Sequence, residues 1–131
     1  MDPATVARLH AASRIGLGAV LTVLPGVLGR MWVGRDARRP ASHVYSVAVG
    51  ARDLGLGLGL LATVDDARAA RPWIAIGMLA DAADLAVTLR HRASLPASGV
   101  ASVGLMAGAS VGLGAWLHRE IDRGAATAQT P

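Results

Sequence analysis

The sequence predicts an all-α protein, a single integral membrane domain built as a four-transmembrane-helix up-down bundle. Three observations carry this prediction. Hydrophobic residues make up 53% of the 131 residues and charged residues only 17%, below the roughly 25% of soluble domains. The apolar residues gather into four runs, separated by short charged breaks. Glycine, with 16 copies, is frequent inside these runs, which soluble helices avoid and membrane helices accept.

Each apolar run is long enough to be one transmembrane helix. A run of about 17 to 24 residues matches a hydrocarbon core of roughly 30 Å at 1.5 Å per residue. The connections are too short for anything but antiparallel neighbours, which gives the up-down order. The predicted helices cover residues 9–28, 41–64, 73–89 and 97–117.

The ends of the runs carry features typical of a membrane boundary. Trp32, Trp73 and Trp116 all lie near run ends, where interfacial aromatic residues belong. Pro25 and Gly26 predict a kink or an early end of the first helix. The segments between the runs are charged breaks, and the polar tail 118–131 is predicted to be flexible.

The alternative is a soluble helical bundle with an alanine-rich core. The strongest evidence against this alternative is the fourth run, residues 97–117, which contains no charged residue. A span of this kind is typical of a helix surrounded by lipid. We therefore predict the lipid bilayer as the surroundings of this chain, and the bacterial inner (plasma) membrane as its location, because the alanine, glycine and arginine bias is typical of GC-rich bacterial genomes.

Composition also excludes several classes of function. The absence of cysteine removes disulfides, thiol chemistry and cysteine-ligated metals. The formal net charge of +4 comes from arginines spread over the run ends, so no basic face for nucleic acid is predicted. The histidines lie near run ends and form no metal set on one helix face; they are His10, His43, His91 and His118. We predict no metal and no cofactor.

Charged residues inside the apolar runs are the most informative feature of the chain. Arg52 and Asp53 fall near the middle of the second run, and Asp81 falls at the same depth in the third. Asp84 follows Asp81 at a spacing of three and shares its helix face. Arg14 lies roughly 9 Å from the middle of the first run. Charges at such depth cost several kcal/mol unless paired, so these five residues should face the interior of the bundle.

The helix geometry also predicts partners for these charges. Arg52 and Asp53 point about 100° apart, so they need not pair with each other. Arg52 should meet Asp81 or Asp84 on the neighbouring helix, and Asp53 should meet Arg14. Two arginines against three aspartates leave one carboxyl without a full partner. It is either protonated and hydrogen-bonded as a structural lock or serves as a proton or ligand site.

Glycines at a spacing of four predict close helix packing. Gly55 and Gly59 have this spacing in the second run, and Gly104, Gly108 and Gly112 have it in the fourth. Such faces pack either inside one chain or between two copies. The fourth run, uncharged and with a glycine stripe, is the best candidate for self-association into a homodimer or a larger membrane complex.

Two short motifs resemble a known family. "GARDLGLGLGLL" in the second run and "DAADLAV" in the third are similar to a set of small integral membrane proteins of unknown function related to the DoxX-like superfamily. A Gly-x-Arg-Asp-Leu-x-Leu-Gly stretch characterises that set, and Gly50, Arg52, Asp53, Leu54 and Gly57 match it here. The resemblance implies a four-helix fold. Some DoxX-like proteins are linked to quinone or thiol oxidoreductase systems, which implies at most an accessory role for a chain without cysteine.

Three functions remain open from the sequence. The leading one is a non-enzymatic or accessory membrane subunit with a buried Arg/Asp cluster, because no catalytic set is recognisable. The second is a proton-coupled small-molecule transporter acting as a homodimer, with Asp81 or Asp84 as proton carrier. The third is a quinone-contacting partner of an oxidoreductase.

Overall fold

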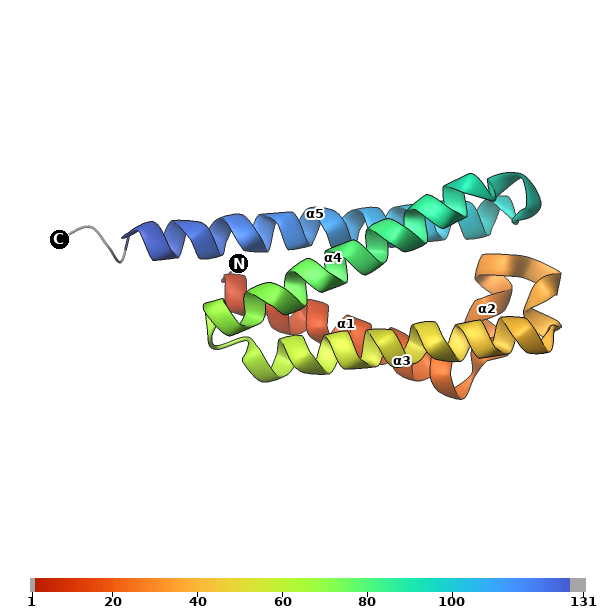
Figure 1. The fold of residues 1–131 in the computed structure, drawn as a ribbon, viewed down its shortest axis with the longest axis horizontal. Helices are drawn as coiled ribbons and strands as arrows, with labels where there is room; N and C mark the ends of the chain where they lie inside the picture. The colour runs from red at the N-terminus through yellow and green to blue at the C-terminus, as the bar shows by residue number, and fades with distance from the viewer. Residues whose placement is uncertain (1, 128–131) are drawn as a thin grey trace.

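The computed structural model describes residues 2–127, with side chains as far as Arg123. This part of the chain is helical throughout and contains no strand, which confirms the all-α prediction (Figure 1). The elements are α1 (Pro3–Val23), α2 (Pro25–Val33), the 3₁₀ helix η1 (Gly34–Arg38), α3 (Pro40–Thr63), α4 (Ala67–Arg90), the 3₁₀ helix η2 (Arg92–Ser94) and α5 (Ala97–Thr127).

Three helices are long and apolar enough to cross a membrane by themselves. They are α3, α4 and the part of α5 from Ala97 to Arg123, with mean hydropathies of 1.3, 1.4 and 1.6. A fourth span exists only if α1 is joined with the segment Pro25–Arg38, and these two are bent by 102° at the break between them. The described chain therefore offers three to four candidate membrane spans.

The first helix ends earlier than the range 9–28 predicts. α1 stops at Val23, and Leu24 leaves the helical region with φ −127° and ψ 58°. Pro25 explains the break, because proline lacks an N–H and disfavours helical geometry in the residue before it. It then starts α2 from a first-turn position, where proline is accepted. The break expected at Pro25 and Gly26 is confirmed, while the predicted loop from residue 29 is wrong, since α2 and η1 occupy most of it.

A side-chain cap lets α1 begin before the predicted residue 9. Asp2 accepts a hydrogen bond from the Thr5 N–H at 3.0 Å, and Pro3 occupies the first turn. The same bond from the Thr5 N–H lowers the pKa of the Asp2 carboxyl below its usual value. α1 therefore extends about two turns beyond the apolar run.

The third predicted helix, 73–89, is also longer at its start. α4 begins at Ala67 because Asp66 caps it, accepting hydrogen bonds from the N–H groups of Arg68 and Ala69 at 2.9 and 3.1 Å. Pro72 lies inside the second turn, where its missing N–H removes one helical hydrogen bond. The charges and the proline of residues 65–72 predicted a break between two helices. The hydrogen bonds that Asp66 accepts instead start α4 inside this segment.

The tail 118–131, predicted to be flexible, is helical as far as Thr127. Residues 128–131 lie outside the described part. Two contacts explain the added turns. Asp122 forms an ion pair with Arg71 of α4, and Ile121 packs against the buried hydrophobic cluster that contains Leu117 and Ile74. The tail is polar in composition but has one face directed at α4.

The helices associate in two close pairs, α1 with α3 and α4 with α5 (Figure 1). Glycines bring α1 and α3 together. A Cβ on Gly18 would lie 2.6 Å from the Gly50 carbonyl oxygen, and one on Gly57 would lie 2.8 Å from the Ala11 carbonyl oxygen. This is the close backbone approach typical of membrane helix pairs.

Most of the glycines predicted for packing lie elsewhere. A Cβ on Gly55, Gly104, Gly108 or Gly112 would meet nothing within 4 Å, while Gly59 packs against the ring of Trp73. The predicted stripe on α5 is therefore open in the single chain. Within the single chain, the spacing of four therefore predicted close packing at Gly59 but not at the other four glycines, because it does not tell an inward face from an outward one.

Candidate functional site

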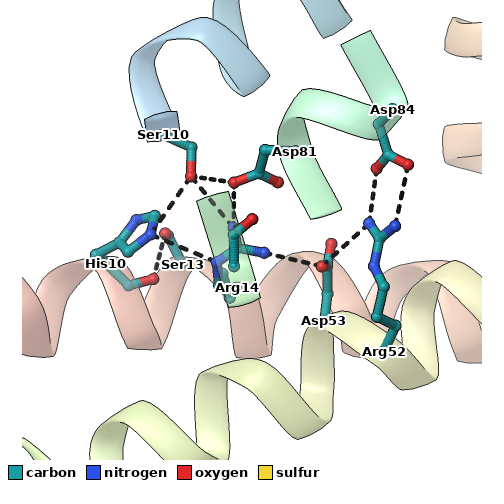
Figure 2. Close-up of polar contacts among 9 residues, drawn as sticks. His10, Ser13, Arg14, Arg52, Asp53, Asp81, Asp84 and Ser110 are labelled. Carbon is teal, nitrogen blue, oxygen red and sulfur yellow. Dashed lines mark hydrogen bonds and ion pairs between the residues drawn. The ribbon is translucent and has the colours of Figure 1, made fainter. Parts of the chain in front are cut away.

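Five charged side chains form one continuous ion-pair network between the two helix pairs (Figure 2). All five are charged residues that the sequence placed inside the apolar runs, facing the interior of the bundle. Positive and negative groups alternate along it in the order Asp84, Arg52, Asp53, Arg14 and Asp81. The network draws on α1, α3 and α4, and it joins the α1–α3 pair to α4.

Arg14 of α1 is the centre of this network and is only 6% exposed. Its Nη1 donates to Asp53 Oδ1 at 2.9 Å. Its Nη2 donates to Asp81 Oδ2 and lies 3.2 Å from both the Gly77 carbonyl oxygen and Ser110 Oγ. One guanidinium thus contacts α3, α4 and α5 from α1, and its donors are all directed at protein acceptors.

Arg52 of α3 holds Asp84 in a two-pronged ion pair. Nη1 lies 3.0 Å from Oδ1 and Nη2 lies 2.6 Å from Oδ2, the parallel geometry in which a guanidinium binds a carboxylate best. Nη2 also lies 3.4 Å from Asp53 Oδ1. The buried Nε of Arg52 has no acceptor among the described residues.

Helix geometry explains why these residues meet. Neighbouring residues on a helix point in different directions, so Arg52 turns to α4 and Asp53 turns to α1. Asp81 and Asp84, three apart, share one face of α4 and meet different arginines. Of the two partners predicted for Arg52, Asp81 and Asp84, the structure has Asp84, and the predicted pair of Arg14 with Asp53 is present. Asp81 pairs with Arg14 instead.

Three participants are missing from the sequence prediction. Ser110 of α5 donates to Asp81 Oδ2, and His10 accepts from Arg14 Nε at 3.4 Å. The Gly77 carbonyl oxygen accepts a hydrogen bond from Arg14 Nη2, and a Cβ on Gly77 would lie 3.2 Å from the same nitrogen. The spacing of four between His10 and Arg14 was a usable signal, because it puts both on one face of α1. Nothing in the sequence distinguishes Ser110 from the other serines.

Arg14, Asp53 and Asp81 are the deeply buried members of this network, while Arg52 and Asp84 are partly exposed. Asp53 and Asp81 are 4% and 8% exposed, and isolated charges at that depth would be strongly destabilising. Pairing offsets this cost, but the two arginines cannot neutralise three carboxylates. The structure thus keeps the surplus of one acidic group that the sequence indicates.

A cavity of about 440 Å³ adjoins the network. Asp53, Asp81, Asp84 and Arg14 form its polar wall, together with Ser110. The remaining lining is mainly apolar and includes Leu17, Leu21, Met31, Trp32, Met106 and Leu113. Its size falls within the roughly 300–1,000 Å³ of small-molecule sites, and apolar walls with a few convergent polar groups are typical of them.

The arrangement provides charge pairing, hydrogen bonding and a cavity. Among residues 2–127 no cluster of three or more His, Asp or Glu side chains is placed to hold a metal ion. The described polar groups can bind a proton or a small polar head group beside an apolar body.

Comparisons with protein-family models, with curated proteins and with solved structures returned no match to this chain.

Proposed function

We propose that the chain is a small multi-pass protein of the bacterial inner membrane, a non-enzymatic or accessory subunit that crosses the bilayer four times in up-down order. In this proposal the Arg/Asp network locks the helices together. The observation that carries it is Arg14, whose single guanidinium contacts α3, α4 and α5 from α1. A fold of the DoxX-like type, as its Gly-x-Arg-Asp-Leu-x-Leu-Gly stretch implies, belongs to the same proposal.

Contacts at the two ends of the helices support four spans over three. Arg8, near the start of α1, pairs with Asp65 in the α3–α4 turn. At the other end, a Cβ on Gly34 of η1 would lie 2.8 Å from Pro96 beside the α4–α5 turn, and Trp32 Nε1 donates to Thr88 Oγ1 of α4 at 3.1 Å. α1 starts at one end of the long helices and ends beside Gly50 of α3, and the bent segment α2–η1 continues to the other end (Figure 1).

Cysteine accessibility in oriented vesicles tests the number of spans, and the native chain has no cysteine to interfere. We expect Thr5→Cys and Asp65→Cys to react with an impermeant thiol reagent from one side, and Asp36→Cys and Ser94→Cys from the other. If Thr5→Cys and Asp36→Cys are labelled from the same side, the bent pair is re-entrant and only three helices cross.

The cavity favours a second candidate, proton-coupled transport of a small molecule by a homodimer. Its specific support is the surplus carboxyl on the cavity wall, and the open face of Gly104, Gly108 and Gly112 on α5 is available for a second copy. Asp81 is the better proton carrier, because Asp84 holds Arg52 with both oxygens. A quinone-contacting accessory role would use the same cavity, and quinone in the purified protein would support it.

Asparagine substitutions separate the lock from the proton carrier. We expect Asp84→Asn to lower stability by about 1–3 kcal/mol, because it removes the charge opposite Arg52. Asp81→Asn should lower the free energy of unfolding by less than about 1 kcal/mol. Arg14 still pairs with Asp53, and the cluster then has two carboxylates for its two guanidinium groups. Thermal unfolding in detergent measures both, with Asp36→Asn in the exposed pair with Arg39 as the control.

The reverse order would contradict this assignment. If Asp81→Asn unfolds well before Asp84→Asn, Asp81 is an ionised structural partner of Arg14 and is unavailable as a carrier. If Asp81→Asn is as stable as the native chain but abolishes the uptake of a small molecule into liposomes driven by a pH gradient, proton-coupled transport is supported over a purely structural role.

A further inference from the structure

The carboxylates on the cavity wall have acceptor atoms that the protein itself does not use. Asp53 and Asp81 accept all their hydrogen bonds from other side chains through one oxygen each, Oδ1 of Asp53 and Oδ2 of Asp81. The second oxygen of each has no partner among the described residues, as Figure 2 shows. The side chains of Asp53 and Asp81 are only 5% and 11% exposed, and both residues line the cavity. Two carboxylate oxygens are therefore held beside this space with free lone pairs.

The donors next to these oxygens are already committed. Arg14 directs its nitrogens at His10, Asp53, Asp81, Gly77 and Ser110. Arg52 is committed to Asp84 and Asp53. Among the described residues, the guanidinium nitrogen without an acceptor is Arg52 Nε, which is enclosed by protein, and Arg52 does not line the cavity. An anionic or purely accepting head group would therefore find no uncommitted guanidinium nitrogen on the cavity wall, whereas a donating head group would find two acceptors.

The net charge of the cluster also favours a positively charged head group. Two guanidinium groups and three carboxylates leave one negative charge, and His10 adds none while it accepts from Arg14 Nε. One additional positive charge balances the cluster. In a region of low dielectric such a charge complement is worth far more than it would be in water.

The rest of the cavity fits an apolar body. Its lining includes Leu17, Leu21, Met31, Trp32, Met106 and Leu113. Met31 on α2 and Met106 on α5 are 56% and 51% exposed, so this part of the lining reaches the outer surface of the protein. Trp32 adds an aromatic ring, which attracts cations, and its N–H is held by Thr88.

We infer that this cavity binds a small amphipathic organic monocation, an ammonium head on an apolar body, with the head at Asp53 and Asp81 and the body against the leucine and methionine wall. In the membrane-spanning arrangement proposed above, such a ligand would reach the opening from the lipid side. The inference concerns binding only and holds whether or not the ligand is transported.

Three probes with the same apolar body test the required head group: phenylbutylamine as its ammonium form, phenylbutanol and phenylbutyrate. Binding is measured by calorimetry in detergent at neutral pH, with empty micelles as the blank. We expect the ammonium to bind at least about tenfold more tightly than the alcohol, since a hydrogen bond to a charged group contributes that much. Binding of phenylbutyrate should be weaker than that of either.

Two variants locate the site, each with a matched control. Asp81→Asn should remove most of the preference for the ammonium, while Asp36→Asn, exposed and outside the cavity, should keep it. Ala109→Phe places a bulky ring in the cavity lining on α5 at a residue that takes no part in the ion pairs, and it should weaken ammonium binding at least about tenfold. Ala101→Phe, on the same helix but outside the lining, should not. The Ala109 variant keeps the test valid if Asp81→Asn does not fold.

Equal affinity for the ammonium and the alcohol, tighter binding of phenylbutyrate, or ammonium binding unaffected by Ala109→Phe would overturn the inference. Circular dichroism and the stability of the native chain in detergent are recorded on the same samples. A folded, membrane-inserted protein that binds none of the probes would reject the cation site and leave the proposed lock intact. A chain that does not insert into membranes would reject the proposed function itself.

Discussion

Replacing Arg14 by methionine is expected to destabilise the protein by about 3–5 kcal/mol, the usual loss when one partner of a buried ion pair is removed. The substitution keeps most of the side-chain length but leaves Asp53 and Asp81 buried without their main partner. Those carboxylates must then take up protons or draw in water, and the α1–α3 pair keeps the Arg52–Asp84 pair but loses the contacts that Arg14 makes with α4 and α5. Unfolding in detergent, followed by circular dichroism, measures the change.

A matched control and a rescue make this prediction specific. Arg8→Met removes another arginine of α1, but its pair with Asp65 is exposed, so the change should stay within about 1 kcal/mol. Adding Asp53→Asn and Asp81→Asn to Arg14→Met should recover much of the stability, since replacing a complete buried ion set by neutral groups is often tolerated. Equal effects of the Arg8 and Arg14 variants would show that the network does not hold the helices together.

Alanine at Gly50 is expected to destabilise the α1–α3 pair by about 1–3 kcal/mol, the typical range for overpacking. Its Cβ would lie 2.6 Å from Thr22 Oγ1 and 2.8 Å from both the Gly18 carbonyl oxygen and the Thr22 nitrogen. Two of these atoms are backbone, so the two helices would have to separate. Separation would also move Asp53 away from Arg14, because Asp53 follows Gly50 by less than one turn.

Gly55 provides the control on the same helix. A Cβ there meets nothing within 4 Å, and alanine is favoured over glycine inside a helix by up to about 1 kcal/mol. Gly55→Ala should therefore be neutral or mildly stabilising when both variants are unfolded in the same detergent. If the two substitutions have the same effect, close approach at Gly50 does not determine how α1 and α3 pack.

The network and the cavity use the same side chains, which links stability to binding. Asp53 and Asp81 each direct one oxygen to Arg14, and both residues line the cavity. A ligand at these carboxylates would add to the charge balance that holds the helices. The native protein should then be more stable when a ligand occupies the site, as any ligand that binds only the folded state requires.

The sequence by itself determined the helical class and which charged residues turn to the interior of the protein. Runs of about 20 apolar residues permit only helices or closed barrels in lipid, and the lack of strand alternation selects helices. Arg14, Arg52, Asp53, Asp81 and Asp84 stand out because ionised groups at such depth are too costly to leave unpaired. Helix spacing was also sufficient to separate the directions of Arg52 and Asp53, so their partners could be predicted.

Only the tertiary structure decided which faces meet. The period of a helix places residues on a common face but does not say where that face points, so Gly104, Gly108 and Gly112 turned out open, while Gly18, Gly50 and Gly57 make the close approach. Ser110 joins Asp81 across 29 residues of sequence and Arg14 across 96, distances over which no local pattern gives a signal. Capping and packing likewise set the boundaries of α4 and α5. Hydrogen bonds to Asp66 stabilise the first turn of α4, in a segment whose composition predicted a break. Contacts of Ile121 and Asp122 stabilise turns of α5, in a segment whose composition predicted a flexible tail.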